Sequence, residues 1–354
     1  MKKFIALVLA AVTLLSFASC SSGGKTAQNS KASSKASNSE KDKILEVLDR
    51  CGYMGVAIVT KNGKTVLEYA NGKDEDGEKL SVKSSMYIGS VSKQFCAAAV
   101  MMLRDSGKLS VKDKLKKYFP KYKYADRITI KNLLTMRSGI ISMVEGKSGS
   151  IAPDFSRKKN IKAQLDAIFK EPLNFKPGSK YEYSNSNYFL LSNIVEMVSK
   201  KSYIDFIREN IFKPLKMNSS GFVDEVRKHP AWAKGLSYDT FTGNDSCEGV
   251  TQGAGDIVSN TKDMSAWMTA LLNGKVVKES TFKEMTKNYS PDHGYYGYAL
   301  EGQTKGGIGH SGLIGNYHSK DYMNKKLGYN IFLSTRNNVP IFENIPRMII
   351  NAVG

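Results

Sequence analysis

The spacing of apolar side chains along this chain of 354 residues changes more than once, and each pattern predicts a different kind of structure. Ser39, with Asp42 three residues later, has the pattern of a helix start, and the apolar positions that follow share one helical face. Two strand-like runs come next, over residues 55–60 and 64–69, and an Asn-Gly pair between them is a strong hairpin signal. The first folded segment is therefore predicted to be a helix followed by a hairpin.

Helical spacing dominates the middle of the chain. The segment 90–106 is apolar nearly all round and ends at Gly107, which predicts a buried central helix. Further helices are predicted over residues 129–137, 187–200, 203–212 and 261–272.

Strand-like spacing returns in the last part of the chain. Strands are predicted over residues 295–300, 308–313, 316–321 and 328–334, and a closing helix over 340–352. Strands at both ends with helices between them predict an α+β fold in which an antiparallel sheet is flanked by helices and a second lobe is all α. We expect the sheet lobe to comprise about 42–88 and 290–354 and the helical lobe about 89–289. A cleft between the lobes is the expected place for a site.

The first residues have the pattern of an export signal. Two lysines precede an apolar run from Phe4 to Ala18, and this run is too short for a membrane span of about 20 residues. Residues 17–20 resemble a lipoprotein cleavage box, which predicts that residues 1–19 are a signal peptide and that Cys20 is lipidated. Plain secretion with a free Cys20 is the alternative. We therefore expect an extracytoplasmic protein that a lipid anchor holds at the cell membrane.

Residues 20–41 are predicted to be a flexible tether between this anchor and the folded part. Residues 21–41 hold seven serines, four lysines and no large apolar side chain, so they cannot bury enough surface to offset the entropy of ordering them. The remaining residues, 42–354, are long enough and apolar enough for one large domain or two intergrown ones.

The chain is strongly basic, with 52 Lys and Arg against 33 Asp and Glu. The basic residues are scattered and do not form a nucleic-acid motif, so no nucleic-acid partner is predicted. Anionic envelope polymers or lipid headgroups are the expected counterparts at an exported location. Cysteine and histidine spacings that suit zinc are not found, and with Cys20 acylated the three other cysteines allow at most one disulfide, among Cys51, Cys96 and Cys247.

A serine and a lysine three residues apart form the first candidate for chemistry. Ser90 and Lys93 share a face at the start of the predicted central helix, so the amine can reach the hydroxyl. Serine needs such a neighbouring base, and desolvation can lower the pKa of a lysine enough to let it accept the proton. The Ser90 amide at the helix start is also a candidate oxyanion donor.

Two further segments carry polar candidates. Tyr183 and Asn185 can point the same way and offer a phenol for proton relay and an amide for a substrate carbonyl; alternatively, they only introduce the helix that follows. The segment 309–312, Gly-His-Ser-Gly, suggests the nucleophile elbow of α/β-hydrolases, but Leu313 stands where the last glycine belongs and the context is strand-like. Ser311 is therefore the weaker candidate for the nucleophile.

These three segments, in this order, resemble the family of class C β-lactamases, D-alanyl-D-alanine carboxypeptidases and related esterases. The resemblance extends from about Ile44 to the C-terminus, and other stretches support it, at 88–95, 133–140, 211–215, 253–259 and 294–298. It implies that Ser90 forms an acyl-enzyme while Lys93 and Tyr183 transfer protons. No metal or organic cofactor is implied.

The resemblance also implies roles in substrate binding. Asn185 would bind the substrate amide, and His310 would stand on a strand edge beside Tyr183, where the β-lactamases usually carry a lysine. Gly312 would border the substrate on the same strand, and the backbone N–H of Leu313 would be the second oxyanion donor.

Departures from the family pattern bear on the substrate. A neutral imidazole at His310 attracts a carboxylate weakly, and Leu313 lacks a hydroxyl that some members use, so tight recognition of a terminal D-Ala is in doubt. Met136-Arg137 replaces a His-Thr pair, in a segment to which no catalytic role is assigned. The expected function is hydrolysis of cell-wall peptide or D-amino-acid amides. The alternatives are a small-ester esterase, a β-lactamase and a non-catalytic penicillin- or wall-binding protein.

Overall fold

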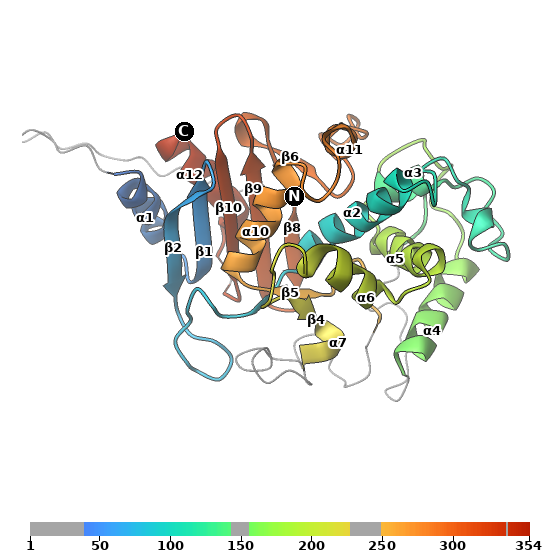
Figure 1. The fold of residues 1–354 in the computed structure, drawn as a ribbon, viewed down its shortest axis with the longest axis horizontal. Coiled ribbons are helices and arrows are strands. Elements are labelled where there is room, and N and C mark those ends of the chain that lie inside the picture. Colours follow the sequence, from blue (N-terminus) through green and yellow to red (C-terminus); the bar gives the residue numbers. More distant parts are fainter. Residues whose placement is uncertain (1–38, 143–155, 227–248, 338) are drawn as a thin grey trace, which may run out of the picture. The chain divides into compact units, whose positions relative to one another are not determined.

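An antiparallel sheet of seven strands organises this computed structural model, which describes residues 39–142, 156–226, 249–337 and 339–354. The strands follow the order β2-β1-β10-β9-β7-β6, and β8 also pairs with β9. β1 pairs with β10, so segments from the two ends of the chain meet in this sheet (Figure 1). The predicted α+β class is thereby confirmed. The strands are β1 (Gly55–Lys61), β2 (Lys64–Asn71), β6 (Glu301–Gln303), β7 (Gly307–Gly309), β8 (Ser311–Ile314), β9 (Tyr317–Asn324) and β10 (Tyr329–Thr335).

The described chain starts at a helix cap. Ser39 accepts a hydrogen bond from the Asp42 N–H at 3.2 Å and so begins α1 (Glu40–Arg50), as the sequence pattern predicts. The predicted signal peptide, Cys20, most of the tether and Cys247 lie outside the described residues. Where the structure describes the chain, no helix is long and apolar enough to cross a membrane.

Alternating side chains of the central strands pack against helices on the two faces of the sheet. Ile58 and Phe332 lie in the same apolar cluster as Trp267 of α10. Their neighbours Val59 and Ile331 instead join the cluster formed with the two terminal helices. α10 falls within the range expected for the helical lobe, but it packs against β1 and β10. The helices on the two faces are α1, α12 (Ile345–Val353) and α10 (Thr261–Leu272).

The helical part of the molecule is built around α2. This helix packs against α5 and α6 and is buried along almost its whole length, as its nearly continuous apolar sequence predicts. A small second sheet lies at its start, in the order β3-β5-β4. The remaining elements are α2 (Ser92–Asp105), α3 (Ile130–Leu134), α4 (Arg157–Lys170), α5 (Asn185–Ser199), α6 (Tyr203–Ile207), α7 (Val223–Val226), α11 (Glu279–Met285), β3 (Met86–Tyr87), β4 (Gly221–Phe222) and β5 (Ile257–Ser259).

Three helices, α4, α7 and α11, were not predicted from the sequence. α4 starts with a run of basic residues and buries the polar side chains of Asn160 and Gln164 in addition to Ile168. When amide side chains occupy the buried positions of a helix, its apolar residues no longer recur with a clear helical spacing. The sequence of α4 therefore does not indicate a helix.

The strand predicted over residues 295–300 is wrong. Ala299 has a φ of +56°, and the Gly297 N–H donates to the Leu300 carbonyl at 2.7 Å, so the chain turns tightly here. The strand β6 begins only after this turn. A run of aromatic residues therefore has the pattern of a strand, although Tyr296 and Tyr298 are buried in a turn and Tyr295 is exposed.

The short strands β3, β4 and β5 were also not predicted, and the remaining differences concern boundaries. The single strand predicted over 308–313 is split at His310 into β7 and β8. The closing helix is preceded by a 3-10 turn, Phe342–Asn344, and α6 continues into a π-helical turn, Arg208–Phe212.

Candidate active site

Ser90 lies in a tight turn that touches strand β8. The 3-10 turn η1 (Gly89–Val91) precedes α2, so Ser90 stands just before the α-helix rather than inside it. Gly89 has a φ of +48°, and a Cβ at this position would lie 2.9 Å from the Leu313 nitrogen. Glycine is needed here because the turn and the backbone of β8 are in direct contact.

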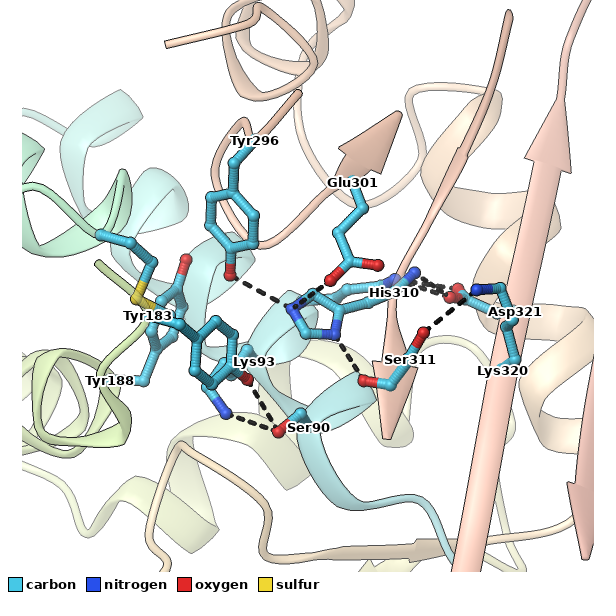
Figure 2. Close-up of polar contacts among 12 residues, drawn as sticks. Ser90, Lys93, Tyr183, Tyr188, Tyr296, Glu301, His310, Ser311, Lys320 and Asp321 are labelled. Atoms are coloured by element: carbon cyan, nitrogen blue, oxygen red, sulfur yellow. Dashed lines mark hydrogen bonds and ion pairs between the residues drawn. The ribbon is translucent and has the colours of Figure 1, made fainter. Parts of the chain in front are cut away.

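Lys93 and Tyr183 both approach the hydroxyl oxygen of Ser90. The Lys93 Nζ donates to Ser90 Oγ at 2.8 Å and to the Ala254 carbonyl at 2.6 Å. The Tyr183 hydroxyl donates to the same Ser90 Oγ at 2.9 Å. Lys93 is fully buried, with its Nζ 5.0 Å from the centroid of the Tyr183 ring. The three side chains thus form one compact group (Figure 2).

The segment around Met136 holds Tyr183 in place. The Glu182 N–H donates to the Met136 carbonyl at 2.9 Å, and the Ser184 N–H points at the Met136 sulfur at 3.4 Å. Met136 is buried and has a φ of +57°, a left-handed conformation that is uncommon for a residue with a side chain. No catalytic role is predicted for this segment from the sequence, but its contacts position Tyr183.

Asn185 lies two residues after Tyr183, where α5 begins. It is the first residue of α5, its side chain is buried, and its backbone N–H donates to Ser142 Oγ at 3.1 Å. Within the described chain it does not line the cavity that contains Ser90 and Tyr183. Its expected role in binding the substrate amide therefore stays a prediction.

Strand β8 turns the Leu313 amide toward Ser90. The Asp321 N–H donates to the His310 carbonyl at 3.2 Å, and Leu313 faces His318 in the register of β8 and β9. Hydrogen-bonded and non-bonded pairs alternate along an antiparallel ladder, so the N–H of Leu313 points away from β9. That side is occupied by the turn of Gly89, which lies against the Leu313 nitrogen. The Ser90 and Leu313 amides can therefore both bind a developing oxyanion.

Gly312 allows this close approach. A Cβ on Gly312 would lie 2.2 Å from the Ile88 carbonyl oxygen and 2.4 Å from Ser319 Oγ. A side chain at this position would force β8 away from the turn that carries Ser90. The close packing of β8 against the turn that carries Ser90 therefore requires a glycine at position 312.

His310 is buried between β7 and β8 and is held by two hydrogen bonds. Its Nδ1 lies 2.6 Å from the Ser311 carbonyl, which can only accept, so Nδ1 carries a proton. In the neutral ring, Nε2 then accepts from the Tyr296 hydroxyl at 3.2 Å. Burial lowers the pKa of His310, and the Glu301 carboxylate, with Oε1 at 3.9 Å from Nε2, opposes this shift. The ring is therefore neutral at pH 7.

His310 stands beside Tyr183, as the family resemblance implies. Its ring centroid is 6.1 Å from that of Tyr183, so the two side chains are neighbours. However, both ring nitrogens of His310 are used by Tyr296 and Ser311. Tyr296, whose pKa burial raises well above its usual value, stays protonated and is the donor in this pair. His310 thus contacts Tyr183 through ring packing.

A buried polar network lies behind His310. The Asp321 carboxylate accepts hydrogen bonds from the backbone N–H of His310 at 2.6 Å and from Gln94 Nε2 at 2.9 and 3.0 Å. Gln94 also accepts from the Trp267 indole at 2.9 Å. Burial raises the pKa of Asp321 to about 7, although the bonds from Gln94 and His310 oppose this shift. The network connects α2, α10 and β9 to the break between β7 and β8.

A cavity of about 490 Å³ opens beside Ser90. Its walls come from η1, the segment before α5, the strands β6, β8 and β9, and the 3-10 turn η5 (Phe342–Asn344). It is lined by Ser90, Tyr183, Glu301, His310, Ser311, Gly312, Leu313, His318, Val339, Pro340, Phe342 and Glu343.

Ser311 also lines this cavity, but its surroundings do not favour a nucleophile. Its hydroxyl donates to Glu343 Oε2 at 2.7 Å and accepts from Lys320 Nζ at 3.1 Å. Lys320 also forms an ion pair with Glu343, so its amine is bound to a carboxylate and, among the described residues, Ser311 has no base placed as Lys93 is placed at Ser90.

The structure therefore brings Ser90, Lys93, Tyr183, His310 and the amides of β8 together, as expected, and adds residues that sequence reasoning missed. Those residues are Met136, Tyr296, Glu301 and Asp321. Tyr296 lies in a stretch that carried the family resemblance, yet nothing in that stretch signalled its contact with His310. Among the described residues no group of three His, Cys, Asp or Glu could hold a metal ion. Cys96 is buried, which raises the pKa of its thiol far above the usual value and suits a packing role.

Comparisons with known proteins identify the family of this chain. The family model described as Beta-lactamase matches residues 41–345. A putative penicillin-binding protein PbpX from Bacillus subtilis is 31% identical over 284 residues, which cover 78% of this chain and 70% of the relative. Protein flp from Staphylococcus aureus is 27% identical over 87% of this chain, and the match spans 64% of that relative's length.

The fold is shared with solved structures. A D-amino acid amidase from Ochrobactrum anthropi superposes with a TM-score of 0.73 over 89% of this chain and 98% of that chain, at 21% identity. At this identity the likeness establishes the fold alone.

Proposed function

Because this chain belongs to the β-lactamase family, a family of serine hydrolases, we propose that it forms an acyl-enzyme on Ser90 and hydrolyses cell-wall peptide or D-amino-acid amides. The observation that carries this proposal is the meeting of Lys93 and Tyr183 at a single oxygen, Ser90 Oγ, at 2.8 and 2.9 Å. A nucleophile with two proton-transfer groups at hydrogen-bond distance is the arrangement that serine acyl transfer needs.

The first step acylates Ser90. The oxygen attacks the substrate carbonyl while its proton passes to the amine of Lys93 or the oxygen of Tyr183, whichever is unprotonated. The negative charge on the tetrahedral intermediate is bound by the N–H groups of Ser90 and Leu313. When the intermediate collapses, the bond to the leaving group breaks, and that group departs as an amine or alcohol with the proton.

The second step regenerates the enzyme. Water attacks the acyl ester and gives a proton to the same pair of side chains. The pair returns a proton to Ser90 Oγ as the acyl bond breaks, which releases a carboxylic acid. No metal or organic cofactor is needed for either step.

A small-ester esterase is the second candidate, and one observation favours it. The cavity beside Ser90 is lined by no Lys or Arg among the described residues. A substrate carboxylate would therefore meet no permanent cation on these walls. The amide substrate is supported by the likeness in fold to a D-amino acid amidase.

The two candidates are separated by assaying one preparation with three reagents. Purified protein and its Ser90→Ala variant are incubated with a fluorescent penicillin, a D-Ala-D-Ala peptide and a p-nitrophenyl ester, and the adduct is mapped by mass spectrometry. We expect one adduct, at Ser90, and turnover that disappears in the variant. An adduct at Ser311, or no reaction with any reagent, would refute the proposal.

We also propose that the mature chain is lipidated at Cys20 and works at the outer face of the cell membrane. The support is the leader pattern of residues 1–20 and the Ser- and Lys-rich segment after it. Labelling of growing cells with an alkyne fatty acid should mark the wild-type protein, whereas Cys20→Ala should be unlabelled and released from the membrane fraction. A labelled Cys20→Ala protein would contradict this assignment.

A further inference from the structure

The cavity beside Ser90 differs in charge from the rest of the chain. The chain carries 52 basic and 33 acidic side chains, yet the lining of this cavity contains two carboxylates, Glu301 and Glu343, and neither Lys nor Arg among the described residues. A cleft with one sign of charge selects ligands of the opposite sign.

Glu343 is already neutralised by the protein. Its Oε2 forms an ion pair with Lys320 Nζ and accepts the hydroxyl of Ser311. The Lys320 side chain is only 11% exposed, so this pair is partly shielded from solvent. Glu343 therefore contributes little net charge to the cavity.

Glu301 has no such cation. In the described part of the chain, the only basic nitrogen within 4.0 Å of its carboxylate is His310 Nε2, at 3.9 Å. That nitrogen accepts the Tyr296 hydroxyl, and the buried ring is neutral, so it offers Glu301 no positive charge. Glu301 is 32% exposed on its side chain and lines the same cavity as Ser90.

Figure 2 shows how these groups are arranged. Glu301 projects from its strand toward the His310 ring, and Ser90 lies on the other side of that ring. A ligand that spans this wall meets the nucleophile at one end and an unneutralised carboxylate at the other.

We infer that Glu301 is a specificity-determining residue that pairs with an ammonium group of the substrate, so that the cleft prefers aminoacyl amides and esters with a free amine. This inference rests on the proposed acyl-hydrolase function and adds the charge of the preferred substrate. The substrate ammonium takes the place beside Glu301 where the protein provides no cation. Because the cavity partly desolvates the ammonium and the carboxylate, salt screens their attraction less than it would at the surface. Acyl compounds with a carboxylate at this place are disfavoured by the same charge.

The test compares two substrates that differ in one group. D-alanine methyl ester carries an ammonium where D-lactate methyl ester carries a hydroxyl of similar size. The kcat/KM for each is measured in wild-type protein, in Glu301→Gln and in the matched control Glu68→Gln. Glu68 is exposed on β2, which lies at the opposite edge of the sheet from β6.

We expect the wild-type protein to favour the alanine ester by about 10- to 100-fold, in line with one charge-assisted contact. Glu301→Gln should lower this preference about tenfold, through a loss of kcat/KM for the alanine ester that is larger than any change for the lactate ester. Glu68→Gln should keep the wild-type preference, which shows that the loss of one negative charge is not by itself the cause.

The outcomes separate this inference from the proposed function. Hydrolysis of both esters through Ser90, with the same preference in wild type and Glu301→Gln, would overturn the role of Glu301 and leave the acyl hydrolase standing. The role of Glu301 would also be overturned if the wild-type protein hydrolysed both esters without a preference for the alanine ester. Failure to hydrolyse any ester, with no adduct on Ser90, would refute both.

Discussion

The two walls of the cavity are built differently. On the helical side, Ser90, Lys93 and Tyr183 are joined by hydrogen bonds of 2.8 and 2.9 Å, and Lys93 is fully buried. On the strand side, the polar groups are spread along β6, β8 and η5, and the side chains of Glu301 and Glu343 are 32% and 56% exposed.

This difference separates chemistry from selectivity. Proton transfer requires short, fixed distances, which a buried helix start supplies. Choice among substrates requires charges that a ligand can reach, which the strand edge supplies. Changes on the helical wall should therefore lower the rate for every substrate, whereas changes on the strand wall should alter the ratio between substrates.

The largest effect is expected from removing a proton-transfer group on the helical wall. Lys93→Ala and Tyr183→Phe should each lower kcat by about 10²- to 10⁴-fold with every substrate, because each removes one partner of the Ser90 hydroxyl. Steady-state assays with an ester and an amide provide the measurement. If either variant keeps the wild-type rate, another residue is the base and the helical wall does not carry the chemistry.

The next effect is expected where the two walls touch. In Gly312→Ala, the new Cβ would meet the Ile88 carbonyl oxygen, so β8 must move away from the Ser90 turn and take the Leu313 amide with it. Loss of one oxyanion donor should lower kcat by about 10²- to 10³-fold with little change in substrate preference. Gly306→Ala is a control, since a Cβ there meets nothing within 4 Å, although its φ of +75° adds some backbone strain. Equal rates in the two variants would contradict the oxyanion role of β8.

A smaller and more selective effect is expected at His310. His310→Ala removes two hydrogen bonds but neither proton-transfer group, so ester turnover should fall about 10- to 100-fold while Ser90 can still be labelled. His310→Lys places a cation beside Glu301 and neutralises it. The variant should therefore acylate faster with penicillins, relative to neutral esters, than the wild type does. Circular dichroism must show that the His310→Lys variant is folded. If the ratio of its acylation rate with penicillins to that with neutral esters equals or falls below the wild-type ratio, the prediction is contradicted.

The smallest effect concerns stability. Burial raises the pKa of Asp321 to about 7, above the value of about 3.9 for an unfolded chain. Between these two pH values the folded state holds a proton that the unfolded state has lost, so Asp321 makes the free energy of unfolding decrease as the pH rises from about 4 to about 7. Above this range its contribution is constant.

Denaturant titrations at pH 5, 6, 7 and 8 check this sign. Asp321→Asn should flatten the decrease in unfolding free energy between pH 5 and 7 by about 1 kcal/mol or more, since one pKa unit corresponds to about 1.4 kcal/mol. His310, whose pKa burial lowers, acts in the opposite direction and remains in the variant. An unchanged slope would mean that Asp321 is ionised in the folded protein throughout this range.

Several local features could be predicted because they depend on neighbouring residues. The capping box of Ser39 and Asp42, the buried length of α2 and the hairpin of β1 and β2 follow from short-range patterns. The reach from Lys93 to Ser90 is of the same kind, since three residues near a helix start bring two side chains to one face.

The rest was decided by contacts between distant segments. Glu301 gains its importance only because β6 and β7 pair and bring it to His310, and Met136 matters only because its backbone holds Tyr183 from a segment 47 residues further along. The tight turn at Ala299 overrode an aromatic run that looked like a strand. Sequence alone thus determined the α+β class and proposed the nucleophile with its partners. The walls of the cavity and their charge were decided by tertiary packing, because which charges remain unpaired depends on segments that meet only in the folded chain.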